Sequence, residues 1–117
     1  MQENLYHYRA RVVSVYDGDT CTVDIDLGLH AWIHEEKLRL ARINAPELAG
    51  EERPAGLAAR DFLKSLIDGQ EIHLQTIKDR REKYGRYLAE IFVQHHGARA
   101  NVNDLMVQNG HAVYKEY

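Results

Sequence analysis

The 117-residue chain has the length of one domain and is long enough to bury a hydrophobic core without disulfide or metal support. Its composition, 44% hydrophobic and 28% charged, argues against a disordered chain. The net charge of −3 means that the molecule as a whole does not attract nucleic acid, so any such attraction must be local. We expect residues 1–117 to form a single domain.

Cysteine content and apolar runs limit the class of protein further. The single cysteine, Cys21, allows no intramolecular disulfide and no thiolate zinc cluster, and its alternation with Val23 and Ile25 predicts a core residue. No apolar run has the length of a bilayer-spanning helix, and residues 1–20 lack the regions of a signal peptide. We expect a cytoplasmic monomer with no membrane partner. Secretion stays open, because a removed leader would not be visible.

The first predicted elements are two strands, residues 7–16 and 20–27, joined by a tight turn. Hydrophobic residues alternate along them at Val13, Val15, Cys21, Val23, Ile25 and Leu27. Asp17 and Gly18 suit this turn, because Asp-Gly favours the left-handed dihedral angles of short hairpins. The turn does not account for a second carboxylate, Asp19, at the hairpin tip.

Further extended segments and a helix follow. Residues 30–34 and 37–43 are expected to be extended, and Arg39 should point away from the inward side chains. The predicted inward residues there are Trp32, Leu38 and Leu40. Residues 44–56, which contain both prolines, form a loop, and an amphipathic helix is predicted from about residue 54 to residue 67.

The second half of the chain predicts two more strands and a second helix. Residues 71–77 and 86–94 alternate as strands, and the basic stretch KDRREKYGR, residues 78–86, connects them. A shorter helix covers about 102–109, with Asn101 as its cap, and a last extended piece follows. This order does not fit alternating strand–helix units. It predicts an α+β, mainly β, fold: a five-stranded oligonucleotide-binding (OB) barrel with two packed helices.

Each polar signal taken singly has an ordinary structural explanation. Asp19 could cap a turn, Arg39 could lie on a solvated strand face, and Glu47 could be one of several loop acids. Arg86 could be a surface charge within a solvated basic loop. Their order along the chain is more specific, because DGDT is followed by RLARINAPE and then by KYGR.

These three stretches, together with VNDLMVQNGHA at residues 102–112, resemble the staphylococcal nuclease (thermonuclease) family over most of the chain. The resemblance implies an OB barrel that carries a calcium-dependent phosphodiesterase. In the family manner, such an enzyme hydrolyses DNA, with RNA as a second substrate, and leaves 3′-phosphate ends. It also implies single-stranded nucleic acid as the partner.

The resemblance further implies roles for individual residues. The matching positions are, for Ca²⁺, Asp19, Asn44 and the backbone oxygen of Ala45; for catalysis, Arg39, Glu47 and Arg86; and for contact with a neighbouring phosphate, Lys83 and Tyr84. Asn44 stands where the family has an aspartate.

The chemistry of phosphodiester hydrolysis accounts for these residue types. The transition state gathers negative charge on the phosphate oxygens, which paired arginine forks can bind and a lysine cannot match. Ca²⁺ prefers hard oxygen ligands, and a glutamate can orient or deprotonate a water. The alternative is a non-catalytic barrel that binds single-stranded nucleic acid or a protein partner, which Asn44 and the negative net charge favour.

Overall fold

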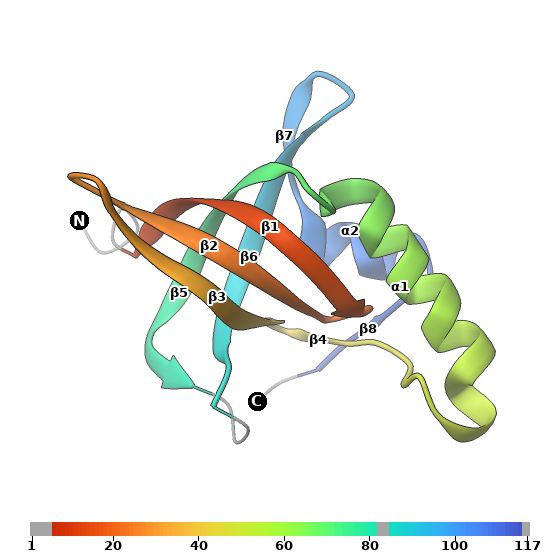
Figure 1. The fold of residues 1–117 in the computed structure, drawn as a ribbon. Helices are drawn as coiled ribbons and strands as arrows, with labels where there is room; N and C mark the ends of the chain where they lie inside the picture. Colours follow the sequence, from red (N-terminus) through yellow and green to blue (C-terminus); the bar gives the residue numbers. More distant parts are fainter. Residues whose placement is uncertain (1–5, 82–84, 116–117) are drawn as a thin grey trace.

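A computed structural model describes residues 6–81 and 85–115, with residues 78–81 described by their backbone alone (Figure 1). In chain order its elements are β1 (His7–Asp17), β2 (Thr20–Gly28), β3 (Ala31–Leu40), β4 (Ile43–Asn44), the 3₁₀ helix η2 (Gly50–Glu52), α1 (Arg53–Ile67), β5 (Glu71–Arg81), β6 (Tyr87–His95), β7 (Ala98–Asn101), α2 (Val102–Gln108) and β8 (Val113–Tyr114).

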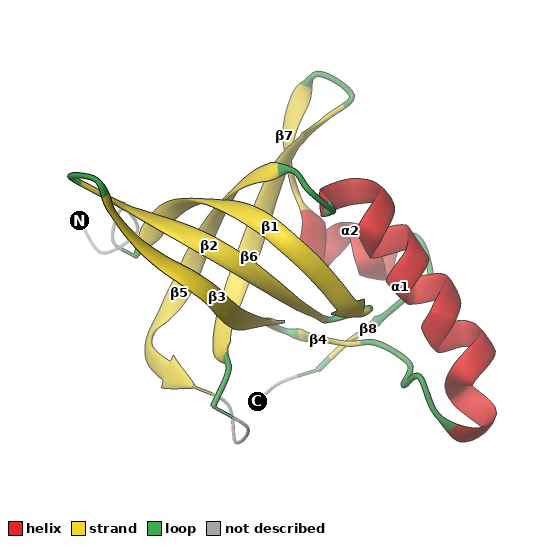
Figure 2. Ribbon diagram, in the orientation of Figure 1, coloured by secondary structure: helices red, strands yellow, loops and turns green. Residues whose placement is uncertain are grey.

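The strands β1, β2, β3, β5 and β6 form a closed barrel (Figure 2). The sheet runs in the order β3-β2-β1-β5-β6-β7, and every neighbouring pair in that order is antiparallel. A parallel pairing of β3 with β6 closes the barrel, with Leu38 opposite Tyr87 and Leu40 opposite Ala89. The predicted α+β, mainly β, OB-type barrel with two helices is confirmed.

The hydrophobic core lies between the barrel and the two helices, which are on the same side of the barrel (Figure 2). Ala59, Leu63 and Ile67 of α1 recur at four-residue intervals and are fully buried. Cys21 is also fully buried, as predicted. Within residues 6–81 and 85–115, no helix is long and apolar enough to cross a membrane.

The helix α2 is attached to the barrel at the joint between β3 and β6. The buried amide of Asn103 donates to the carbonyls of Ala41 (2.9 Å) and Ala89 (3.0 Å) and accepts from the N–H of Ile91 (3.2 Å). The predicted cap is confirmed, because the Asn101 side chain accepts from the backbone N–H at the start of α2. These bonds satisfy buried polar groups and fix the closing joint.

One residue predicted to point inward, and two residues of the predicted hydrophobic alternation, are exposed. The register of β1 shifts between Val12 and Ser14, and this irregularity places Val12 in the core and leaves Val13 45% exposed. Trp32 and Leu27 are 47% and 46% exposed. They lie on the β2–β3 hairpin, which extends past the barrel (Figure 1), so the barrel interior does not reach them.

Gly18 corrects the expected role of the first turn. Its φ is not among the left-handed values, so the turn does not need glycine for its dihedral angles. A Cβ at Gly18 would lie 2.7 Å from the Cβ atoms of both Ala45 and Ala59. Glycine is therefore required by close packing of the turn against α1 and the segment after β4. This packing brings the tip of the β1–β2 hairpin to the functional loop.

Candidate active site

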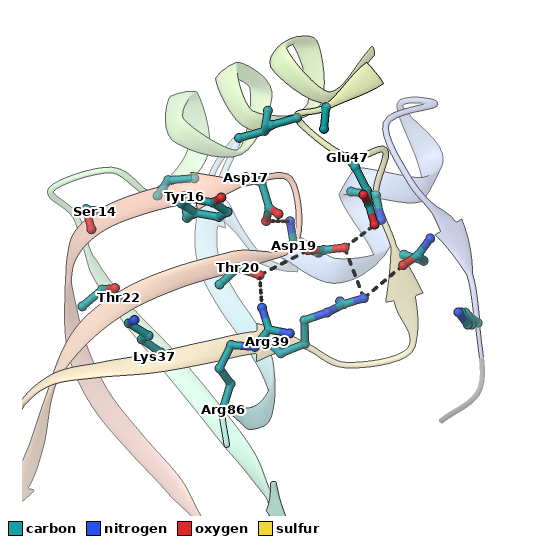
Figure 3. Close-up of a pocket in the computed structure, with 16 residues that line it drawn as sticks. Ser14, Tyr16, Asp17, Asp19, Thr20, Thr22, Lys37, Arg39, Glu47 and Arg86 are labelled. Carbon is teal, nitrogen blue, oxygen red and sulfur yellow. Dashed lines mark hydrogen bonds and ion pairs between the residues drawn. The ribbon is translucent and has the colours of Figure 1, made fainter. Parts of the chain in front are cut away.

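A cleft of about 870 Å³ opens beside the β1–β2 turn and the end of β3 (Figure 3). It is lined by all the predicted site residues that the structure describes, namely Asp19, Arg39, Asn44, Ala45, Glu47 and Arg86. Lys83 and Tyr84 lie outside the described residues. Further lining residues that sequence reasoning did not assign to a site include Ser14, Tyr16, Thr22, Lys37 and Lys115.

The guanidinium of Arg39 lies at the base of the cleft, where only 6% of the residue is exposed. Its Nη1 donates to the carbonyls of Leu40 (2.9 Å) and Ile43 (3.0 Å). Its Nη2 lies 3.2 Å from both Asp19 Oδ2 and Asn44 Oδ1. These bonds hold the guanidinium of Arg39 in a single orientation. Its Nη2 thereby contacts the side-chain oxygens of Asp19 and Asn44, two of the predicted calcium ligands.

Asp19 is buried at the tip of the β1–β2 hairpin, where its carboxylate joins three segments. Oδ2 accepts from the N–H of Ala45 at 2.8 Å, and Oδ1 accepts from the Thr20 hydroxyl at 3.3 Å. Asp17 Oδ1 accepts from the N–H of Asp19 at 3.1 Å, a bond within the turn. Burial first, and then the Asp17 charge, raise the pKa of Asp19 to about 6, although Arg39 lowers it.

Arg86 reaches the cleft from the residue before β6. Its Nη1 donates to Thr20 Oγ1 at 3.0 Å, so the hydroxyl next to Asp19 links β2 to the start of β6 (Figure 3). The register of the barrel joint explains this proximity, because Thr20 lies opposite Arg39 in β2–β3 and Arg39 lies opposite Leu88 in β3–β6. Barrel closure therefore brings the two predicted catalytic arginines to one place.

Glu47 lies on the rim of the cleft, in the loop between β4 and η2, and is exposed. Its N–H donates to Glu52 Oε1 at 3.1 Å. A Cβ at Gly56 would overlap the backbone carbonyl of Glu47, so this glycine lets α1 pack directly against the loop. With the described residues, the Glu47 carboxylate makes no hydrogen bond or ion pair.

The oxygen atoms that line the cleft are of the chemical types that bind a hard cation. They comprise the carboxylates of Asp17, Asp19 and Glu47, the amide oxygen of Asn44 and the backbone oxygen of Ala45. The raised pKa of Asp19 means that its negative charge is only partly compensated, so a bound cation would stabilise it. Among the described residues, no three His, Cys, Asp or Glu side chains cluster as a preformed metal site.

Comparison with known proteins identifies the family. The family model described as staphylococcal nuclease homologue matches residues 37–117 of the chain. The chain belongs to this family. The matched segment of this chain contains Arg39, Asn44, Glu47 and Arg86, and Asp19 precedes it. The resemblance inferred from the motifs is confirmed.

Individual relatives agree with this assignment. The chain is 29% identical to the thermonuclease of Staphylococcus hyicus over 110 residues, which cover 92% of this chain and 59% of the relative. It is 32% identical to the thermonuclease of Staphylococcus intermedius over 85 residues, covering 70% and 47%, respectively. It is also 27% identical to an uncharacterized protein of Methanocaldococcus jannaschii, covering 91% and 58%. The chain spans about half the length of these curated relatives.

Two cations in the cleft of this staphylococcal nuclease homologue were missed by sequence reasoning. Lys115 follows β8, which pairs with β4 so that Val113 lies opposite Asn44, and this pairing brings Lys115 from near the C-terminus into the lining of the cleft. Nothing local in the sequence marks it. Lys37 could have been found, because it lies two positions before Arg39 in a strand and two-residue spacing returns a side chain to the same face.

Proposed function

We propose that this staphylococcal nuclease homologue hydrolyses the phosphodiester bonds of single-stranded DNA, and also of RNA, with Ca²⁺ as cofactor, and that it leaves 3′-phosphate ends. It acts as a monomer in this proposal. The observation that carries it is the convergence of Arg39, Arg86, Glu47 and Asp19 on one cleft from four separate segments. Two of the similar proteins are named thermonucleases, which supports the same class of reaction.

The two arginines would stabilise the charge that develops on the phosphate oxygens. Arg39 is suited to this role because its bonds to the carbonyls of Leu40 and Ile43 fix the guanidinium before substrate arrives. When substrate occupies the cleft, the guanidinium would contact the phosphate as well as Asp19 and Asn44. Arg86, half-buried and held at Thr20, approaches the same space from the other side of the joint.

Glu47 would orient or deprotonate the attacking water. Its carboxylate is exposed on the rim and makes no bond with the described residues, so its oxygens can accept a proton or a hydrogen bond from a water. Asp19, Asn44 and the backbone oxygen of Ala45 would hold Ca²⁺, with Asp17 close to them. When bound, Ca²⁺ supplies positive charge beside the phosphate.

Two features favour a second candidate, a non-catalytic barrel that binds single-stranded nucleic acid or a protein. Asn44 offers the metal site an amide where a carboxylate would add negative charge. The buried guanidinium of Arg39 makes at least four contacts with the described residues, so it is also explained as a structural residue.

Incubation with single-stranded DNA in Ca²⁺ and in chelator separates the two candidates. We expect cleavage that stops in chelator and products whose ends carry a phosphate removable from the 3′ position. Glu47→Gln should lower kcat by about 10²–10⁴-fold and leave strand binding intact. Glu51→Gln, an exposed neighbour outside the cleft, is the matched control. Binding without cleavage at saturating Ca²⁺ would establish the second candidate.

A further inference from the structure

A row of polar side chains crosses the sheet next to the arginine site. Ser14 of β1 lies opposite Thr22 of β2, and Thr22 lies opposite Lys37 of β3. All three line the cleft, and Figure 3 shows them following one another across the three strands. We call these three residues the Lys37 row. Adjacent strands are about 4.8 Å apart, so the row is a continuous polar strip.

The Lys37 row runs beside the row that contains Arg39. Thr20 lies opposite Arg39, and Thr22 and Lys37 are each two residues further along the same strands. Two residues of a strand span about 6.7 Å, and side chains at this spacing share a face. This distance is comparable to that between successive phosphates in an extended nucleic acid strand.

The charge of the Lys37 row suits an anion. The exposed Lys37 ammonium makes no ion pair or hydrogen bond with the residues that the structure describes, and neither do the hydroxyls of Ser14 and Thr22. The next acid along β2 on that face, Asp24, is engaged by His34 (3.4 Å) and by the N–H of Glu35 (2.9 Å). Asp24 therefore bounds the row without neutralising Lys37.

We propose that the Lys37 row binds one of the two substrate phosphates that neighbour the one held by Arg39 and Arg86. The ligand is a phosphodiester of an extended single strand, with the Lys37 ammonium as counter-charge and the two hydroxyls as hydrogen-bond donors. This inference rests on the proposed function, because it concerns the same cleft. It makes the cleft a site for a polynucleotide rather than for a single nucleotide.

Binding to two probes tests this subsite. The first is a labelled oligothymidylate, measured by fluorescence anisotropy in Ca²⁺ with the Glu47→Gln variant so that it is not cleaved. The second is thymidine 5′-monophosphate, whose single phosphate cannot occupy the arginine site and the Lys37 row at once. One phosphate contact on a single strand contributes a salt slope of about −0.7, which corresponds to roughly five-fold in affinity at 0.1 M salt.

Lys37→Gln should therefore weaken oligothymidylate binding about five-fold and reduce the salt slope by about 0.7, with thymidine 5′-monophosphate binding unchanged. Lys37→Arg, which keeps the charge, should bind as the parent does. Lys64→Gln, which removes an exposed charge on α1 outside the cleft, is the matched control. An equal effect of Lys37→Gln and Lys64→Gln, or an equal loss for both probes, overturns the subsite.

The outcomes also separate this inference from the function on which it rests. If the parent protein cleaves the strand and Lys37→Gln binds oligothymidylate as tightly as the parent, the subsite is wrong and the nuclease stands. If the parent neither cleaves nor binds the strand, both proposals fall.

Discussion

Replacing Asp19 by Asn should stabilise the metal-free protein at pH 8. Burial and the neighbouring Asp17 carboxylate raise the pKa of Asp19 from 3.8 to about 6 in the folded state. Because this pKa is higher than in the unfolded chain, ionisation of Asp19 opposes folding. The contribution of Asp19 to stability is greatest below pH 3.8 and is lost as the pH rises through about 6.

The size of the effect follows from the two pKa values. The difference between 3.8 and about 6 corresponds to about 3 kcal/mol of unfavourable free energy at pH 8, where both states are ionised. At pH 5 the same cost is about 1.6 kcal/mol, since the folded carboxyl is mostly protonated there. Asparagine has the same shape and keeps an oxygen for the N–H of Ala45, so Asp19→Asn should recover most of this energy.

Urea unfolding in chelator at pH 5 and pH 8 measures this gain. Asp61→Asn is the control, because Asp61 is exposed on α1 and pairs only at the surface with Arg60, so it should change stability by less than about 0.5 kcal/mol. Ca²⁺ at ten times its Kd should stabilise the parent by about 1.4 kcal/mol and Asp19→Asn by much less. A variant that is less stable than the parent at pH 8, or a gain equal at both pH values, would refute this reasoning.

Other substitutions test the remaining assignments. Asn44→Asp should tighten Ca²⁺ binding from a Kd of roughly 10⁻⁴–10⁻³ M, and equal affinities by calorimetry with a nucleoside bisphosphate present would remove Asn44 from the metal site. Arg86→Lys should lower kcat/KM by about 10²–10³-fold with a loss of at most about 1 kcal/mol in urea unfolding. Arg39→Lys should lose activity and also about 2–4 kcal/mol of stability, because its buried contacts are broken; equal stabilities of the two arginine variants would contradict this. Gly56→Ala should cost about 1–3 kcal/mol and displace the loop that carries Glu47, and a crystal structure with that loop unmoved would show the contact to be adaptable.

The regular parts of the fold were predictable because they follow from local patterns. The helix expected from about residue 54 to 67 is α1, and β2 keeps its alternation through Cys21, Val23 and Ile25. Irregularities were not predictable, because a bulge changes the register without changing composition, as Val13 shows. The short strands β7 and β8 depend on partners distant in the chain and carry too few residues for a periodic signal.

The site was predictable where its residues stand in ordered motifs. Asp19, Arg39, Glu47 and Arg86 were named from short stretches, and the structure brings them to one cleft. Their bonding was not predictable. The sequence could not show that the Arg39 fork is held by two backbone carbonyls, because that depends on the chain path after β3. The reason for Gly18, close packing against two alanines, likewise exists only in the folded chain.

The parallel joint between β3 and β6 also affects when the cleft can form. Because α1 and β5 separate these two strands in the chain, the joint is a non-local contact. We expect it to form after the local β2–β3 hairpin. The cleft further uses Lys115, beyond the last strand. A growing chain on the ribosome therefore cannot complete the cleft until residue 115 has emerged.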